Sequence, residues 1–320
     1  MEYKILGRTG LEVSSIGLGT WAFGNQVYGG VAEIDAIHTI RHALHEGITL
    51  FDTAPQYGTH EQDGVAEIVM GKALKGDRQK TVIQTKFGRN PTIEQGAPQF
   101  YKKRIIASVE ESLKRLQTDY IDVLFFHSPF SINEIHDDVW EGVDSVIQSG
   151  KVRFIGHSIS MFKNTEHFAQ SWSNDGKIDV IQAVLSLMNR EANALIEKLS
   201  QQNVGIVARE CLANGFLSGQ VTNETVFPAG TLNSRYSRDE ITERVSQVDK
   251  FKFLLGGDIT NMAQAAIRAM IDEPGISTVL TGAKNIKELD DAIIAANSHP
   301  FSPETINASK EVLVKNFEAA

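Results

Sequence analysis

Four polar side chains stand at or just beyond the ends of apolar runs in this sequence. They are Asp52, Tyr57, Lys86 and His127, in the segments TLFDTAPQYG, TVIQTKF and IDVLFFH. A tyrosine hydroxyl has an ordinary pKa of about 10, so as a proton donor it needs a neighbour that stabilises the tyrosinate it leaves behind. A lysine ammonium does this, and a carboxylate paired with the lysine keeps the ammonium charged and in place.

A neutral histidine beside this group can donate a hydrogen bond to the oxygen that receives the proton. The set contains no serine or cysteine nucleophile and no metal-binding cluster. It therefore predicts that a carbonyl group is polarised and protonated, while a cofactor supplies the hydride. An acid at the end of a buried strand costs free energy unless it has a partner, and Lys86 would be the partner of Asp52.

These residues meet only if successive strand ends lie at one edge of a sheet. Short runs rich in β-branched and aromatic residues recur along the chain, and we expect eight strands there. They lie around residues 15–20 and at residues 49–54, 81–87, 121–127, 152–158, 178–184, 205–210 and 276–282. Adjacent strands are about 4.8 Å apart, so polar residues that end three successive strands converge on one place.

Amphipathic helical segments separate the expected strands. Residues 65–73 and 106–116, for example, each carry apolar side chains on one face and Lys or Glu opposite. Such helices cover one side of a sheet. Strand followed by helix, eight times over, predicts an α/β fold of the (β/α)8 or TIM-barrel type, with its active site at the C-terminal ends of the strands. No low-complexity linker interrupts the chain, so we expect one barrel domain over residues 1–320.

Three segments lie outside the repeat. Residues 3–14 have a glycine turn between two short alternating runs, which predicts an N-terminal β-hairpin that plugs the bottom of the barrel. Residues 212–258 form a long insertion after the seventh strand, with a helix expected from about residue 238 to 255. We expect this insertion to cover the substrate or the cofactor. Residues 303–317 predict a C-terminal helix.

Composition argues against several classes of partner. The chain has 320 residues and is 42% hydrophobic, which is ample for a large core. Its net charge of −9 argues against a nucleic-acid or anionic-membrane surface, because both need a basic stripe. The single cysteine, Cys211, excludes a disulfide framework within the chain, and no apolar stretch approaches the roughly 20 residues of a membrane span. We expect a cytoplasmic protein that acts on a small carbonyl compound, with its oligomeric state open.

Four separated segments also carry a family resemblance. They are FDTAPQYG, QTKFG, SLKRLQTDYIDVLFFHSP and TVLTGAKNIKELDDA. In order and spacing they resemble the aldo-keto reductase family over essentially the whole chain. That resemblance implies the reduction of aldehydes and ketones to alcohols, and the reverse oxidation, with a nicotinamide cofactor bound without a Rossmann fold. It implies that Tyr57 is the general acid/base and that Lys86 lowers its pKa. Asp52 would support Lys86, and His127 would orient the carbonyl.

The end of the eighth strand predicts where a phosphate would bind. The sequence has no GxGxxG motif, so a dinucleotide site of Rossmann type is not expected. Gly282 lets the backbone approach a phosphate, the following helix N-terminus favours anions, and Lys284 adds a cation. Glu288 lies one turn further on, and a carboxylate near the adenosine ribose would repel a 2′-phosphate. We expect NADP because of Lys284, with NAD as the alternative.

The resemblance also implies contacts to the nicotinamide half of the cofactor. Ser158 and Gln182 match family residues that hold the carboxamide, whereas Ile159 stands where the family has an asparagine. Arg209 stands where an aromatic side chain usually stacks on the nicotinamide. A planar guanidinium can also stack on a ring, and its charge predicts tighter binding of NAD(P)H than of NAD(P)+. The other cofactor contacts that we expect are Gly19, Thr20, Trp21 and Asp52.

Several residues and the whole function have a second interpretation. Trp21 and Phe23 are expected either to form walls of the substrate pocket or to pack within their loop, and Phe130 lies in another loop that shapes the pocket. Cys211 and His157 are expected to have structural roles. One alternative function is a cofactor-sensing regulatory or binding module on the same barrel. Another is a non-redox barrel whose strand-end charges bind an anionic ligand.

Overall fold

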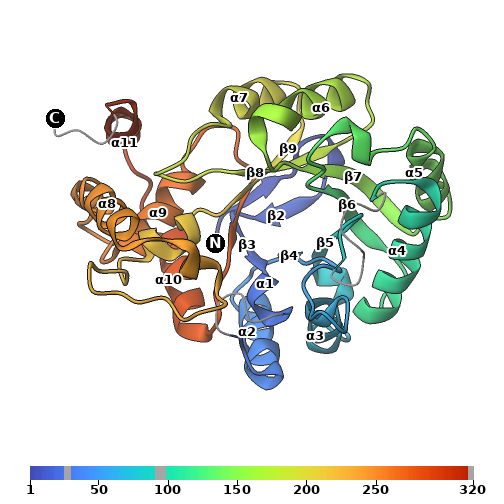
Figure 1. The fold of residues 1–320 in the computed structure, drawn as a ribbon, viewed down its shortest axis with the longest axis horizontal. Helices are drawn as coiled ribbons and strands as arrows, with labels where there is room; N and C mark the ends of the chain where they lie inside the picture. The colour runs from blue at the N-terminus through green and yellow to red at the C-terminus, as the bar shows by residue number, and fades with distance from the viewer. Residues whose placement is uncertain (25–29, 91–98, 316–320) are drawn as a thin grey trace.

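The computed structural model describes residues 1–24, 30–90 and 99–315, and in these residues eight parallel strands close into a barrel (Figure 1). The strands pair in the order β10-β3-β4-β5-β6-β7-β8-β9, and β10 closes the barrel on β3. Their bounds are β3 Ile16–Gly19, β4 Leu50–Asp52, β5 Val82–Phe87, β6 Ile121–His127, β7 Val152–Ser158, β8 Val180–Val184, β9 Gly205–Arg209 and β10 Thr278–Thr281. This is the predicted TIM barrel, and each strand lies within the range expected from the sequence.

Helices surround the barrel on its outside (Figure 1). The helices that follow the eight strands in the described part of the chain are α2 Glu33–His45, α3 Val65–Ala73, α4 Lys102–Leu116, α5 Val139–Gln148, α6 Phe162–Asn174, α7 Asn193–Gln201, α9 Met262–Ile271 and α10 Ile286–Asn297. Their apolar faces pack on the barrel, as Val109 and Leu113 of α4 do in the main core. A short helix that was not predicted, α1 Trp21–Gly24, directly follows β3.

Side chains alternate between the inside and the outside of the barrel, and this alternation decides which residues reach the site. On β5, Val82 belongs to the core inside the barrel, whereas Ile83 and Phe87 belong to the core between the barrel and the helices. Lys86 has the same parity as Val82 and therefore faces inward. By the same rule Asp52 faces inward on β4. Each of these strands thus places a polar residue above an apolar layer.

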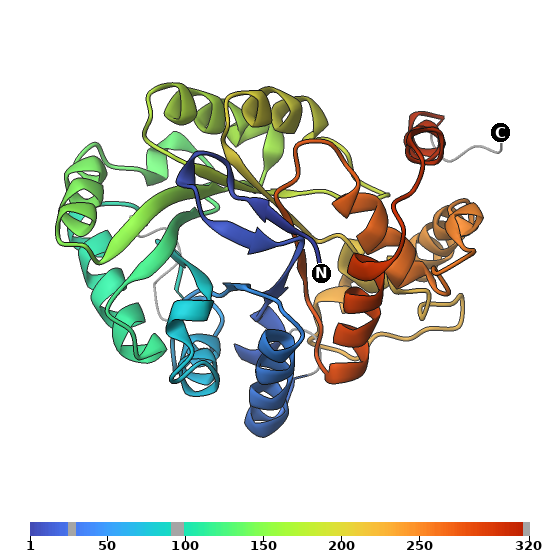
Figure 2. The ribbon, with the colours of Figure 1, turned by 180° about the vertical axis from the view of Figure 1, so that it is seen from behind.

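The N-terminal hairpin closes the bottom of the barrel, as predicted. Its strands β1 Tyr3–Ile5 and β2 Glu12–Ser14 pair antiparallel, and Figure 2 shows them lying across the barrel end. Leu6, Leu11 and Val13 pack into the inner core of the barrel. Gly7, with φ of +50°, lies so close to β9 that an added Cβ would be 2.2 Å from the backbone nitrogen of Gly205. Only glycine fits at this contact.

The insertion after β9 lies beside α9 and contains η4 Ala213–Ser218, η5 Leu232–Arg235, α8 Arg238–Asp249 and η6 Lys252–Leu254. Helix α8 begins with a capping box, in which Ser237 Oγ accepts the Glu240 N–H at 3.3 Å and the Glu240 carboxylate accepts the Ser237 N–H at 2.8 Å. The prediction that this helix continues to about residue 255 was wrong. It ends at Asp249 because the chain turns there to bury Phe251 in the core.

The C-terminal helix α11 Pro303–Val314 lies at the edge of the molecule (Figure 1). Ion pairs hold this helix against the rest of the molecule. Glu273 is paired with Arg190 and also with Lys310 of the helix, whose Nζ lies 2.9 Å from Glu273 Oε2. Arg190 also donates to Ser309 Oγ at 3.2 Å. Among residues 1–24, 30–90 and 99–315, none of the helices has both the length and the apolar character that a membrane crossing requires.

Candidate active site

Asp52, Lys86 and His127 end three successive strands and point into the barrel from its C-terminal rim. Asp52 closes β4, Lys86 is the last residue but one of β5, and His127 closes β6. Their exposed fractions are only 2%, 1% and 7%. Tyr57 lies in the loop between β4 and α3 and is half-buried. The structure therefore brings together the four residues that the sequence singled out.

A buried ion pair connects Asp52 to Lys86 and, through it, to Tyr57. Lys86 Nζ donates to Asp52 Oδ1 at 2.8 Å and to Asp52 Oδ2 at 2.7 Å. It also donates to the Thr53 carbonyl oxygen at 2.9 Å and to Tyr57 Oη at 3.2 Å. Asp52 thus has the partner that its buried position requires, and the ammonium touches the hydroxyl that would give up a proton.

The environment keeps Lys86 charged and Tyr57 protonated at neutral pH. Burial raises the pKa of Tyr57 above its usual value; the charge of Lys86 opposes this, and Asp52 adds to it. Burial disfavours the charged form of Lys86 as well, but attraction to Asp52 and to Tyr57 outweighs it and raises the pKa of the ammonium. Lys86 therefore acts on Tyr57 in the expected direction, although burial has the larger effect.

His127 is neutral at neutral pH, where Lys86 and Tyr57 are both protonated. Burial holds its pKa well below the ordinary value, and the charges of Lys86, Arg89 and Arg209 lower it further. Its ring lies edge-on to that of Tyr57, with the ring centroids 6.0 Å apart. A neutral imidazole retains one N–H, so His127 can donate a hydrogen bond next to the Tyr57 hydroxyl.

These residues lie at one end of a cavity of about 2370 Å³. Pockets for drug-sized ligands occupy roughly 300–1,000 Å³, so this cavity has room for a dinucleotide and a small substrate together. Trp21 lines it with its ring stacked near that of Tyr57, the centroids being 6.1 Å apart. Phe130 also lines it, under the guanidinium of Arg89 at 3.8 Å. Of the two roles expected for Phe23, the structure shows packing, because this side chain is buried in the hydrophobic core.

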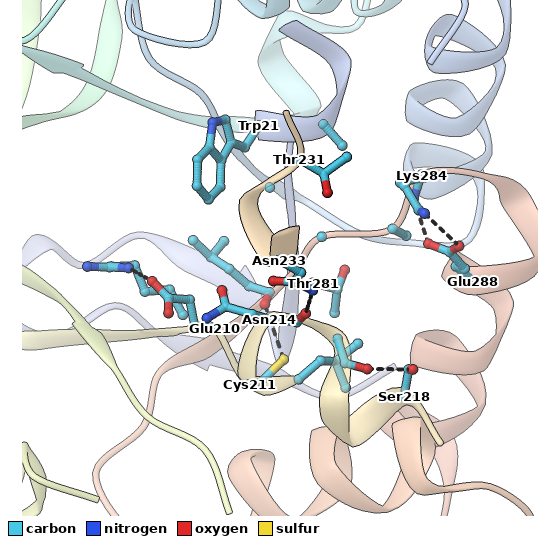
Figure 3. A pocket seen from close by; sticks show the side chains of 18 of the residues that line it. Trp21, Glu210, Cys211, Asn214, Ser218, Thr231, Asn233, Thr281, Lys284 and Glu288 are labelled. Atoms are coloured by element: carbon cyan, nitrogen blue, oxygen red, sulfur yellow. Dashed lines mark hydrogen bonds and ion pairs between the residues drawn. The ribbon is translucent and has the colours of Figure 1, made fainter. Parts of the chain in front are cut away.

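The other end of the cavity is formed by the end of β10 and the start of α10. A Cβ added to Gly282 would meet no described atom within 4 Å, so the backbone there is open to the cavity. Glu288 Oε2 accepts the Lys284 N–H at 3.0 Å, and Lys284 Nζ lies 3.9 Å from Glu288 Oε1. An open backbone, a helix N-terminus and an ammonium fit the phosphates of a dinucleotide, and Glu288 partly offsets the ammonium charge. Figure 3 shows Lys284 and Glu288 on one side of the cavity and Trp21 on the other.

Polar side chains from β7 and β8 form the wall between the two ends. Ser158 closes β7 and Gln182 lies in the middle of β8. Gln182 Nε2 donates to Asp52 Oδ1 at 2.8 Å, and Ser158 Oγ donates to Gln182 Oε1 at 3.4 Å. Both residues line the cavity, as expected for contacts to a carboxamide, but the bond from Gln182 to Asp52 was not predicted.

Arg209 continues this wall from β9. Its guanidinium donates to the Ile159 carbonyl oxygen at 2.9 Å and to Ser160 Oγ at 3.0 Å, and it forms an ion pair with Glu210. Ile159, which stands where an asparagine was expected, is itself buried. The carboxylate of Glu210 therefore partly neutralises the positive charge that was predicted at Arg209.

The segment after β3 divides between the cavity and the core. Gly19 and Trp21 line the cavity. Thr20, between them, is fully buried, and its N–H and hydroxyl both donate to the carbonyl oxygen of Asp52, at 2.9 and 3.0 Å. Thr20 thus fixes the end of β4 in the described structure.

Comparison with known proteins identifies the family of the chain. Residues 15–314 match the model of the Aldo/keto reductase family. The chain belongs to this family. It is 34% identical to Aldo-keto reductase YhdN of Bacillus subtilis over 91% of this chain and 87% of that protein. It is 30% identical to L-galactose dehydrogenase of Arabidopsis thaliana over 99% of this chain and 96% of that protein.

A solved structure agrees with this membership. Aldo-keto reductase AKR11C1 from Bacillus halodurans, in its holo form, matches with a TM-score of 0.76 and 26% identity, over 98% of this chain and 96% of that chain. The barrel described above is thus the fold of an aldo/keto reductase, and the protein is an oxidoreductase that acts on CH–OH groups.

Part of the cavity of this aldo/keto reductase was not predicted from the sequence. Glu210 lines it in a left-handed conformation, with φ of +58°. Asn214 has the same φ, and its carbonyl oxygen accepts a hydrogen bond from Asn233 Nδ2 at 2.8 Å, which fixes the insertion over the cavity (Figure 3). The dipeptide Asn214-Gly215 is a turn signal that could have been recognised, whereas no sequence signal marks Glu210.

Cys211 and His157 occupy structural positions in the reductase. Cys211 is buried; burial raises its pKa to about 12, and Sγ donates to the Leu280 carbonyl oxygen at 3.4 Å. His157 faces out of the barrel, with its ring edge-on to Trp172 and the centroids 5.1 Å apart. Burial lowers the pKa of His157 to about 3, so it is neutral. Both positions agree with the roles expected of these residues.

Proposed function

We propose that this protein reduces an aldehyde or ketone to an alcohol with NAD(P)H, and catalyses the reverse oxidation, with Tyr57 as the general acid and base. The observation that carries the proposal is the 3.2 Å contact between Tyr57 Oη and Lys86 Nζ, beside the two short bonds from Lys86 to Asp52. A charged ammonium at this distance stabilises a tyrosinate, so it favours a hydroxyl that gives up its proton.

Each residue has one task in the proposed reaction. When bound, a nicotinamide cofactor supplies the hydride. Tyr57 Oη gives its proton to the carbonyl oxygen, and Lys86 stabilises the tyrosinate that remains. His127 donates a hydrogen bond to the same oxygen and so fixes the carbonyl group. Asp52 keeps Lys86 charged and in contact with Tyr57, and the tyrosinate recovers its proton from solvent.

The cofactor proposed as preferred is NADPH, with NADH also accepted. Gly282 and Lys284 would hold phosphate groups, while Ser158 and Gln182 would hold the carboxamide. The 3.9 Å separation between Lys284 Nζ and Glu288 Oε1 supports only a small preference, because a carboxylate so close to the ammonium weakens its attraction for a 2′-phosphate. Arg209 would lie against the nicotinamide, and its pairing with Glu210 likewise reduces the expected preference for the reduced cofactor.

The direct test is the consumption of NADPH and NADH by the purified protein with a panel of aldehydes and ketones that includes 4-nitrobenzaldehyde. We expect turnover with both cofactors and a higher kcat/KM for NADPH. Binding of NADPH without turnover of any carbonyl compound would instead support a cofactor-sensing module. A higher kcat/KM for NADH would reverse the proposed preference while leaving the reaction intact.

A further inference from the structure

One hydrogen bond crosses the barrel and ends on the acid of the candidate site. Gln182 Nε2 donates to Asp52 Oδ1 at 2.8 Å, and the two side chains are only 1% and 2% exposed. Their strands, β8 and β4, are four places apart in the closed order of the barrel, so the bond joins opposite walls. Asp52 Oδ1 is also the oxygen that Lys86 Nζ contacts at 2.8 Å. Hydrogen bonds to a buried carboxylate are among the stronger ones in proteins.

The Gln182 amide also ends a chain of side-chain hydroxyl groups. Ser158 Oγ donates to Gln182 Oε1 at 3.4 Å and contacts Ser128 Oγ at 3.3 Å. Ser160 Oγ donates to Ser128 Oγ at 3.0 Å, and Arg209 donates to Ser160 Oγ at 3.0 Å. The hydrogen bonds of this series can all point the same way, from the Arg209 guanidinium to the Asp52 carboxylate, so that each bond polarises the next.

We propose that Gln182 is a positioning residue, which fixes Asp52 across the barrel so that the carboxylate holds Lys86 against Tyr57. This role is additional to the carboxamide contact that the family resemblance implies for Gln182, and it rests on the proposed reaction. Without the amide donor, Asp52 would keep its two bonds from Lys86 but lose the bond that fixes its carboxylate from the opposite wall, so the contact between Lys86 and Tyr57 would be held less precisely. The undiminished negative charge of Asp52 would also raise the pKa of Tyr57, which makes the hydroxyl a weaker acid.

The barrel contains a matched control for this substitution. Gln84 on β5 is also an inward-facing glutamine with no exposed surface, and neither of its amide atoms has a hydrogen-bond partner among the described residues. Gln84→Met therefore removes the same atoms from the same barrel interior as Gln182→Met, but takes no bond from Asp52.

A double-mutant cycle between Gln182 and Asp52 tests the proposal. We would measure kcat with saturating cofactor and aldehyde, and the cofactor Kd by quenching of protein fluorescence. Gln182→Met is expected to lower kcat about tenfold. The corresponding increase in activation free energy is part of the free energy of one hydrogen bond to a charged group. In the Asp52→Ala background the same substitution is expected to change kcat less than about twofold, because its partner is gone. Gln182→Leu, which also removes the amide without adding a charge beside Asp52, serves if Gln182→Met does not fold.

The outcomes separate the role of Gln182 from the reaction itself. Equal losses of kcat in both backgrounds, or a change in the cofactor Kd alone, would overturn the positioning role. A loss of the same size in Gln84→Met would also overturn it, since any buried amide would then matter equally. Absence of turnover in the unsubstituted protein would overturn the proposed reaction, and this result is known before any variant is made.

Discussion

Breaking the ion pair between Asp52 and Lys86 should have a large effect on stability. The two residues are 2% and 1% exposed and are joined at 2.7 and 2.8 Å, so removing either one leaves the other charge buried without its counter-ion. Such a loss costs about 3–5 kcal/mol. We therefore expect Asp52→Leu and Lys86→Met each to destabilise the fold by this amount at neutral pH.

This free energy converts to a measurable shift in melting temperature. With an unfolding entropy of about 2.1 cal/mol/K per residue, the entropy of the 320-residue chain increases by about 0.67 kcal/mol/K on unfolding. Dividing the lost free energy by this entropy gives a melting temperature about 4–7 °C lower for each single variant. The double variant Asp52→Leu/Lys86→Met replaces the pair with apolar side chains. It should melt above both single variants, because no buried charge is left unpaired.

Thermal unfolding followed by circular dichroism measures all four proteins. A double variant whose loss equals the sum of the two single losses would refute the pairing. The dependence on pH gives a second check. The pKa of Lys86 is raised above 10.5 by the fold, so its contribution is complete below that pH and is lost as the pH rises through the folded value. Strong alkali should therefore lower the melting temperature of the unsubstituted protein more than that of Lys86→Met.

Three further substitutions test other parts of the structure. Burial holds the pKa of His157 at about 3, against about 6.5 when unfolded, so between these values the unfolded protein binds the extra proton. The free energy of unfolding should therefore decrease by up to about 1.4 kcal/mol for each unit by which the pH falls from about 6.5 to about 3. In His157→Leu, melting temperatures should fall less steeply over that range, and an equally steep fall would contradict this. Gln84→Met should stabilise the fold by about 1–2 kcal/mol, since it removes a buried amide without partners, and a lower melting temperature would count against it. Glu288→Gln should raise the ratio of kcat/KM for NADPH over NADH about tenfold by freeing Lys284, and an unchanged ratio would show that Glu288 does not weaken it.

The barrel could be predicted from the sequence because its pattern is repeated and local. Apolar runs of strand length alternate with amphipathic helical segments, and each needs only its own residues to be recognised. The end of α8 could not be predicted in this way. Phe251 and Leu254 continue a helical spacing, yet the chain turns after Asp249 to bury both in the core. A pattern of apolar residues does not separate one long helix from a helix followed by a turn.

The site was predictable where strand ends determine it. Asp52, Lys86 and His127 lie at the ends of successive strands, so their order in the sequence already places them together. The bond between Gln182 and Asp52 was missed because it joins opposite walls, and its length depends on the width of the barrel interior rather than on the order of strands. Glu210 was missed because its place depends on a left-handed backbone that its residue type does not favour.

Tyr57→Phe tests the central claim most directly. The substitution removes one hydroxyl and leaves the aromatic ring and the ion pair between Lys86 and Asp52 in place. The protein, saturated with NADPH, would be mixed rapidly with an aldehyde, and the rate of hydride transfer in a single turnover would be measured together with the cofactor Kd. We predict a rate at least about 100-fold lower, with the Kd changed less than about twofold. A rate within about threefold of the unsubstituted protein would contradict the assignment of Tyr57 as the proton donor.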